Sequence, residues 1–128
     1  MREIKFRGLD VSGNTWHYGF LAIPEVGEYA GRSFISNKVG MPLAFEVRPE
    51  TVGQLTGLKD KNRVEIYEGD VVSIGSGEDT WKVRYDWGAF ILMSIEHRGN
   101  GALLYWKCED WPLEVIGNIC ENPELLET

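Results

Sequence analysis

Acidic side chains gather in one short stretch of the sequence, where carboxylates could hold a metal ion. Asp60, Glu65, Glu68 and Asp70 lie within this stretch, and carboxylate oxygens suit a hard cation such as Mg²⁺. Their spacing does not follow a calcium-loop pattern, and basic residues lie among them. A solvated hairpin with charges paired across its strands explains the same stretch. We expect this plainer arrangement and no metal site.

Histidine and cysteine are the other residue types that could do chemistry. His17 and His97 would have to converge in space to form an acid–base or metal pair, and no third partner stands near either in the sequence. Cys108 and Cys120 cannot complete a four-ligand zinc site. The sequence contains no nucleophile, phosphate-loop or zinc-protease motif. We therefore predict no catalytic residues and no cofactor, and we favour a non-enzymatic role over an enzymatic one.

A basic strand face is the main candidate for nucleic-acid binding. Lys82 and Arg84 alternate with the apolar residues from Trp81 to Tyr85, and Trp87 follows in a turn. Such a patch could bind a single strand by stacking and by charge. The chain has 13 basic and 20 acidic residues, for a net charge of −7, which opposes general binding to phosphates. An ordinary polar strand face is the simpler interpretation.

Tryptophan is abundant, with five in 128 residues. Core packing accounts for Trp16 and Trp81. Trp87 and Trp111 could instead be exposed, and exposed aromatic side chains often anchor a protein partner or a subunit interface. A protein partner or a homo-oligomer is therefore the leading prediction, with packing as the alternative because tryptophan is rarely buried completely even in cores.

The composition indicates one soluble globular domain. Hydrophobic residues make up 43% of the chain, which is enough to form a core at this length. No apolar run approaches the 18 or so residues of a membrane span, and charged residues interrupt the start, so we expect neither a membrane segment nor a signal peptide. The two cysteines fit a reducing cytosol.

Hydrophobic alternation with a period of two dominates the sequence and predicts short strands. The predicted strands cover residues 4–7, 16–23, 33–36, 43–47, 71–74, 81–85, 89–95, 102–106 and 115–119. An extended segment is expected after Arg48, and a hairpin turn in which Asn62 takes the left-handed conformation. A short helix from Pro123 to Glu127, capped by Asn122, is expected at the end.

This pattern predicts a mainly β fold, a small barrel-like domain of antiparallel strands. Residues 69–119 have the strand–hairpin–strand rhythm of SH3-like barrels. We treat residues 1–128 as a single domain, with possible subdomains at 1–56 and 57–128.

Three stretches in the right order resemble the YopX family of phage and prophage proteins. They are Met1 to Arg7 with Trp16, Tyr18 and Gly19 shortly after; Glu50 to Gln54 continuing through Thr56 to Asp70; and Glu114 to Ile119 followed by Glu121 to Leu126. Arg63 departs from the family, which commonly has glycine there, and Cys120 stands where an aromatic residue or histidine is usual.

The resemblance implies a β-rich fold, a phage or prophage origin and hence the cytoplasm of a bacterial host, and it carries no catalytic residues. We therefore expect an accessory protein that binds another protein or itself. The alternatives are a single-strand nucleic-acid binder using Lys82, Arg84 and Trp87, and a metal-dependent enzyme using the acidic stretch.

Overall fold

The fold is mainly β, as predicted. The computed structural model describes residues 3–36, 44–74, 79–86, 88–95, 101–104 and 112–126, and the strand pairings within each sheet are antiparallel. The chain divides into two units, Met1–Leu55 and Thr56–Thr128, called here the first and second units. In the described part of the chain, no helix is long and apolar enough to cross a membrane.

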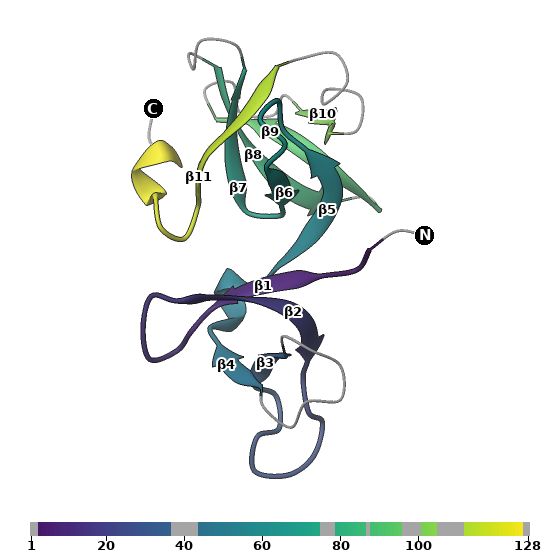
Figure 1. The fold of residues 1–128 in the computed structure, drawn as a ribbon, viewed down its shortest axis with the longest axis vertical. Helices are drawn as coiled ribbons and strands as arrows, with labels where there is room; N and C mark the ends of the chain where they lie inside the picture. The colour runs from purple at the N-terminus through teal and green to yellow at the C-terminus, as the bar shows by residue number, and fades with distance from the viewer. Residues whose placement is uncertain are drawn as a thin grey trace. The chain divides into compact units, whose positions relative to one another are not determined.

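The first unit is a sheet of short strands (Figure 1). Its strands are β1 (Phe6–Leu9), β2 (Trp16–Ala22), β3 (Ser33–Ser36), β4 (Phe45–Val47) and the beginning of β5 (Gly53–Lys59), in the order β4-β3-β2-β1-β5. A small hydrophobic core lies against one face of the sheet. In this core Ile35 is 0% exposed and Val47 is 1% exposed.

The sheet of the first unit curls until its first and fourth strands meet. Asp10 forms a bridge with Val47, and the Arg48 N–H donates to the Leu9 carbonyl at 2.9 Å. Gly8 allows this approach, since a Cβ there would lie 2.7 Å from Val47 Cγ2.

Arg48 is extended, as its position before a proline predicted, but a 3-10 turn, η1 (Pro49–Thr51), follows it. The expected extended segment is therefore interrupted and resumes at Val52. The Thr51 hydroxyl donates to the Arg48 carbonyl at 2.6 Å and accepts from the Leu9 N–H at 2.8 Å. Proline fixes the φ angle that begins such a turn. The threonine hydroxyl adds a second hydrogen bond to the Arg48 carbonyl, which already accepts from the Thr51 N–H, and it connects the turn to β1 through Leu9.

The second unit contains the larger sheet. Its strands are the end of β5, then β6 (Glu65–Tyr67), β7 (Asp70–Ile74), β8 (Asp79–Asp86), β9 (Ala89–Ser94), β10 (Gly101–Leu103) and β11 (Leu113–Asn118). Five of them form a sheet in the order β10-β9-β8-β7-β11, and β6 lies beside β5.

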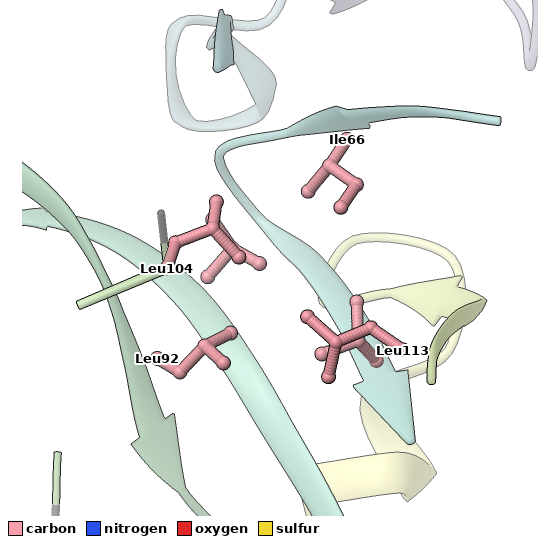
Figure 2. Close-up of a cluster of buried hydrophobic side chains, with 6 residues drawn as sticks. Ile66, Leu92, Leu104 and Leu113 are labelled. Atoms are coloured by element: carbon pink, nitrogen blue, oxygen red, sulfur yellow. The ribbon is translucent and has the colours of Figure 1, made fainter. Parts of the chain in front are cut away.

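A hydrophobic core lies against one face of this larger sheet (Figure 2). It consists of the buried residues Ile66, Val72, Val83, Leu92, Leu104 and Leu113. Trp81 packs against this cluster, as the sequence predicted. Since side chains alternate along a strand, the residues between these core positions point to the opposite face.

The described strands of the second unit do not close into a barrel, because β10 and β11 are separate edges of the larger sheet. An SH3-like barrel therefore stays a prediction. The C-terminal segment forms a 3-10 turn, η2 (Pro123–Leu126), where the sequence predicted a helix from Pro123 to Glu127.

Asn122 was expected to cap that helix, but its side chain turns back toward β11. Its Oδ1 accepts from the Asn118 N–H at 3.2 Å, and the side chain of Asn118 accepts from the N–H of Cys120 at 3.0 Å and of Glu121 at 2.8 Å. A Cβ at Gly117 would lie 2.6 Å from Asn122 Oδ1. Glycine at this position therefore lets the tail pack on its own strand.

Candidate functional site

The Asp60 carboxylate holds a turn together and is only 7% exposed. Its Oδ1 accepts from the Asn62 N–H at 2.8 Å and from the Val64 N–H at 2.9 Å. Its Oδ2 accepts from the Val115 N–H on β11 at 3.0 Å. One carboxylate therefore satisfies three backbone donors and joins the β5–β6 turn to a strand that is distant in the sequence.

The left-handed residue of this turn is Arg63, with φ 67°, and not Asn62 as predicted. The Arg63 N–H donates to the Asp60 carbonyl at 3.0 Å. A side chain in this conformation brings Cβ close to the neighbouring carbonyl oxygen, at a cost of roughly 1–2 kcal/mol. Arg63 therefore carries a strain that glycine would not.

Asp70 has a similar structural role in the turn between β6 and β7. It is 2% exposed, and its Oδ2 accepts from the Tyr67 N–H at 2.8 Å. In the same turn, the Gly69 N–H donates to the Val83 carbonyl at 2.9 Å, and the Gly69 carbonyl accepts from the Ile119 N–H at 2.9 Å. Asp70 thus fixes a turn that contacts β8 and the residue that follows β11.

Glu65 and Glu68, the other members of the acidic stretch, are half-buried. Among the described residues, no group of three or more His, Cys, Asp or Glu side chains is placed to hold a metal ion. The hydrogen bonds of Asp60 and Asp70 commit those carboxylates to backbone donors. A metal site in this stretch stays the less favoured alternative.

Lys82 and Arg84 share one face of β8, as the alternation predicted. Lys82 pairs with Val71 and Met93, and Arg84 pairs with Ile91, so the two cations stand among apolar side chains on the face opposite the core. Lys82 is half-buried and Arg84 is exposed. Trp87 and Trp111, the aromatic candidates, lie outside the described residues.

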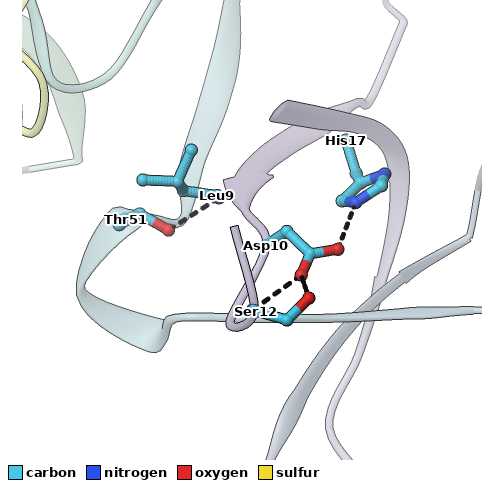
Figure 3. A network of polar contacts seen from close by, with 5 residues as sticks. All are labelled: Leu9, Asp10, Ser12, His17 and Thr51. Atoms are coloured by element: carbon cyan, nitrogen blue, oxygen red, sulfur yellow. Dashed lines mark hydrogen bonds and ion pairs between the residues drawn. The ribbon is translucent and has the colours of Figure 1, made fainter. Parts of the chain in front are cut away.

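His17 has an acidic partner that sequence reasoning missed (Figure 3). Its Nε2 lies 2.8 Å from Asp10 Oδ2, and the other carboxylate oxygen of Asp10 accepts from the N–H of Ser12 at 2.8 Å and from its hydroxyl at 2.6 Å. The Ser12 bonds, then that of His17, lower the pKa of Asp10 to about 2. His97 lies outside the described residues.

The Asp10–His17 pair connects separate segments of the first unit. The Ser12 hydroxyl donates to Asp10, so its proton is turned away from the imidazole. The His17 ring stacks on Phe45 with centroids 4.0 Å apart and an interplanar angle of 5°. The pair therefore ties β2 to the turn after β1 and to β4. In the sequence, Asp10 at the start of the turn after β1 was the feature that could have indicated this pair.

The first unit carries a surface that the sequence analysis did not single out. Alternation along β2 places Trp16, Tyr18 and Phe20 on one face of the sheet, and the register with β3 adds Phe34. Tyr29 packs edge-on against Phe34, with ring centroids 5.7 Å apart. These five residues are called the aromatic face.

The aromatic face lies opposite the core of the first unit, so the prediction that Trp16 packs in the core was wrong. Trp16 and Phe34 are half-buried, and the other three residues are exposed. Tyr18 is 44% exposed, Phe20 48% and Tyr29 50%, whereas Ile35 on the other face of the sheet is fully buried. The outer face of an antiparallel sheet is ordinarily polar. Contiguous exposed aromatic side chains are typical of a binding surface. The sequence signal was the aromatic residue at every second position of β2.

Charged side chains of both signs border the aromatic face. The Arg7 guanidinium lies 4.9 Å from the centre of the Trp16 ring, and that of Arg32 lies 5.5 Å from the centre of the Tyr29 ring. Arg32 Nη1 is also 3.6 Å from Glu46 Oε1, and its side chain is 51% exposed. Cations over aromatic rings and a single ion pair thus lie on one surface.

The two units differ sharply in charge. Residues 1–55 contain six Lys and Arg against six Asp and Glu, whereas residues 56–128 contain seven against fourteen. The net charge of −7 therefore belongs to the second unit, which also carries Lys82 and Arg84. The aromatic face lies on the neutral unit.

Two comparisons with known proteins agree with this fold. The family described as YopX protein matches residues 5–127. The crystal structure of protein EF1440 from Enterococcus faecalis is similar, with a TM-score of 0.61 and 25% sequence identity over 99% of this chain and 100% of that chain. No curated protein sequence matches the chain.

Proposed function

The chain belongs to the YopX family, and we propose that it is a non-enzymatic phage or prophage accessory protein that binds a protein through the aromatic face. Its place of action in this proposal is the cytoplasm of the bacterial host. The phage origin rests on what the family resemblance implies.

The observation that carries the proposal is the exposure of Tyr18, Phe20 and Tyr29 on a sheet face that would ordinarily be polar. Aromatic residues and arginine are enriched at the centres of protein interfaces, where acidic residues and lysine are depleted. The aromatic face has this composition, with Arg7 and Arg32 beside it. Trp87 and Trp111 stay candidates for a second contact.

Site-specific photo-crosslinking tests this proposal. A benzophenone amino acid in place of Phe20 should give protein adducts in host cells, because such a side chain would face the partner. The matched control is Tyr85, an aromatic residue of the second unit that is 52% exposed. Absence of protein adducts at position 20, or equal adducts at both positions, would contradict the proposal.

Binding of single-stranded nucleic acid is the second candidate, with Lys82, Arg84 and Trp87 as its site. The shared face of the two cations on β8 supports it, and barrels of the SH3-like type can present such a patch. The acidic charge of the second unit opposes it. Salt-sensitive binding of a labelled oligonucleotide, reduced in Lys82→Ala/Arg84→Ala, would support this candidate, and no binding at low salt would reject it.

A metal-dependent enzyme using Asp60, Glu65, Glu68 and Asp70 ranks last. Two of these carboxylates accept hydrogen bonds from backbone amides, and a metal would have to displace those bonds. A melting temperature that does not change on adding Mg²⁺ or Mn²⁺ would exclude the site.

A further inference from the structure

Building on the proposed function, we infer that the partner at the aromatic face is a second copy of this chain, bound face to face about a two-fold axis. In such an arrangement the same surface patch serves both molecules, so the patch must complement itself. The charge of the two units and the position of Arg32 and Glu46 both support this occupant.

The charge distribution selects the first unit for self-association. Two molecules that met through their second units would bring together surfaces with an excess of seven acidic residues each. Like charges at this range repel within about one Debye length, roughly 8 Å at physiological salt. Two first units carry no net charge, so the surfaces that would meet do not repel each other in this way. A neutral aromatic surface on an acidic protein is therefore suited to a neutral partner, and an identical molecule provides one.

An ion pair that borders the aromatic face offers opposite charges to a second copy of the same surface. Arg32 and Glu46 lie side by side, with Nη1 and Oε1 3.6 Å apart. A two-fold axis near them would place Arg32 of each molecule opposite Glu46 of the other. The interface would then contain this contact twice near its centre, with the aromatic side chains beside it.

Nucleic acid fits the aromatic face less well. Binding to a phosphate backbone commonly engages about six to ten Lys or Arg side chains. Among the described residues, the cations that lie over its rings are Arg7, which is buried, and Arg32, which is paired with Glu46. These two cations are fewer than a polyanion commonly engages, and they suit a protein surface.

Sedimentation equilibrium of the full chain over a concentration series tests the inference. We expect a monomer–dimer equilibrium whose Kd rises roughly tenfold or more in Phe20→Ser, since aromatic anchors dominate interface affinity. The control Tyr85→Ser removes an equally exposed aromatic residue from the second unit and should leave Kd unchanged. Equal effects of both substitutions would overturn the inference.

Charge reversal provides a test that does not depend on the aromatic residues. Arg32→Glu alone and Glu46→Arg alone should each weaken self-association, since each places like charges opposite one another across the axis. An equimolar mixture of the two variants should form a heterodimer about tenfold tighter than either homodimer. A mixture that associates no better than the separate variants would overturn the face-to-face arrangement.

The results also separate this inference from the proposed function. A monomer at every concentration, together with adducts from position 20 to a different protein, would remove the second copy as occupant and leave protein binding through the aromatic face in place. A monomer without adducts would remove both. An adduct with the mass of two chains would support both.

Discussion

The two units bury their side chains differently, although both are built from short antiparallel strands. The second unit packs six fully or almost fully buried residues into one cluster against its larger sheet. The first unit buries Ile35 and Val47 on one face of its sheet and leaves Tyr18, Phe20 and Tyr29 about half exposed on the other. The second unit therefore buries large side chains in a core that stabilises it. The first unit leaves several of its own aromatic side chains exposed to solvent.

Charge follows the same division. The second unit carries the whole net charge of −7, and the first unit is neutral. High net charge favours solubility and opposes association, whereas a neutral surface with exposed aromatic residues favours association. Under the proposed function, the first unit is the part that binds, and the second unit supplies the larger core and the net charge.

The largest difference between the two units in the free energy of unfolding should come from truncating a core side chain of the second unit. Leu92→Ala removes a side chain that is 0% exposed and should lower the free energy of unfolding by about 4 kcal/mol, because a cavity remains. Phe20→Ser should cost less than about 1 kcal/mol, as for most exposed positions. Urea denaturation followed by tryptophan fluorescence measures both. Similar losses for both would show that the aromatic face is structural.

The buried carboxylate of the second unit should come next. Asp60→Ala leaves three backbone N–H groups without their acceptor and should cost about 3 kcal/mol. The control Asp79→Ala removes an exposed carboxylate of the same unit and should stay within about 0.5 kcal/mol. An equally small cost for Asp60→Ala in urea denaturation would reject its structural role.

The first unit has its own sensitive point where β1 approaches β4. Gly8→Ala places a Cβ 2.7 Å from Val47 Cγ2 and should cost about 2 kcal/mol through overpacking. In a double-mutant cycle, Val47→Ala should relieve part of this cost, with a coupling of about 1 kcal/mol. If the losses in the free energy of unfolding caused by Gly8→Ala and Val47→Ala were additive, the two positions would not be coupled, and the close contact between β1 and β4 would be contradicted.

A stabilising change is expected at the strained turn of the second unit. Arg63→Gly removes the side chain from a residue at φ 67° and should raise the free energy of unfolding by up to about 1 kcal/mol. Asn62→Gly, at the position where the sequence wrongly predicted the left-handed residue, should not stabilise. A higher melting temperature for Asn62→Gly than for Arg63→Gly would contradict this assignment.

The smallest expected effect is on the pH dependence of the unfolding free energy, through Asp10 in the first unit. The pKa of Asp10 is about 2 in the folded chain against an ordinary value of 3.8, so its contribution to stability is complete above 3.8 and is lost as the pH falls through 2. Asp10→Asn should flatten the dependence of the unfolding free energy on pH in this interval. Glu25→Gln, at an exposed loop position, should keep the slope of the parent chain.

Local patterns in the sequence were sufficient for much of the fold. Alternation predicted the strand around Lys82 and Arg84, and it placed Trp81 correctly against the core. Pro49 correctly predicted extended backbone at Arg48, but the 3-10 turn after it was missed, because the Thr51 hydroxyl of this turn also bonds to Leu9, far away in the sequence. The same limit applied to Asp10, whose bond to His17 depends on how the turn after β1 folds.

The acidic stretch shows why residue type alone could not identify a site. Its carboxylates have the chemistry of metal ligands, but Asp60 accepts hydrogen bonds from backbone amides, one of them on β11. Whether a carboxylate faces a cation or a buried N–H depends on what the folded chain places beside it.

The sequence by itself determined the mainly β fold, the family and the excess of acidic charge, because these follow from short-range alternation, from motifs in order and from composition. Tertiary structure alone decided that the aromatic residues of β2 face solvent while the aliphatic residues behind them are buried. Alternation divides a strand into two faces, but only the packing of distant segments determines which face is covered.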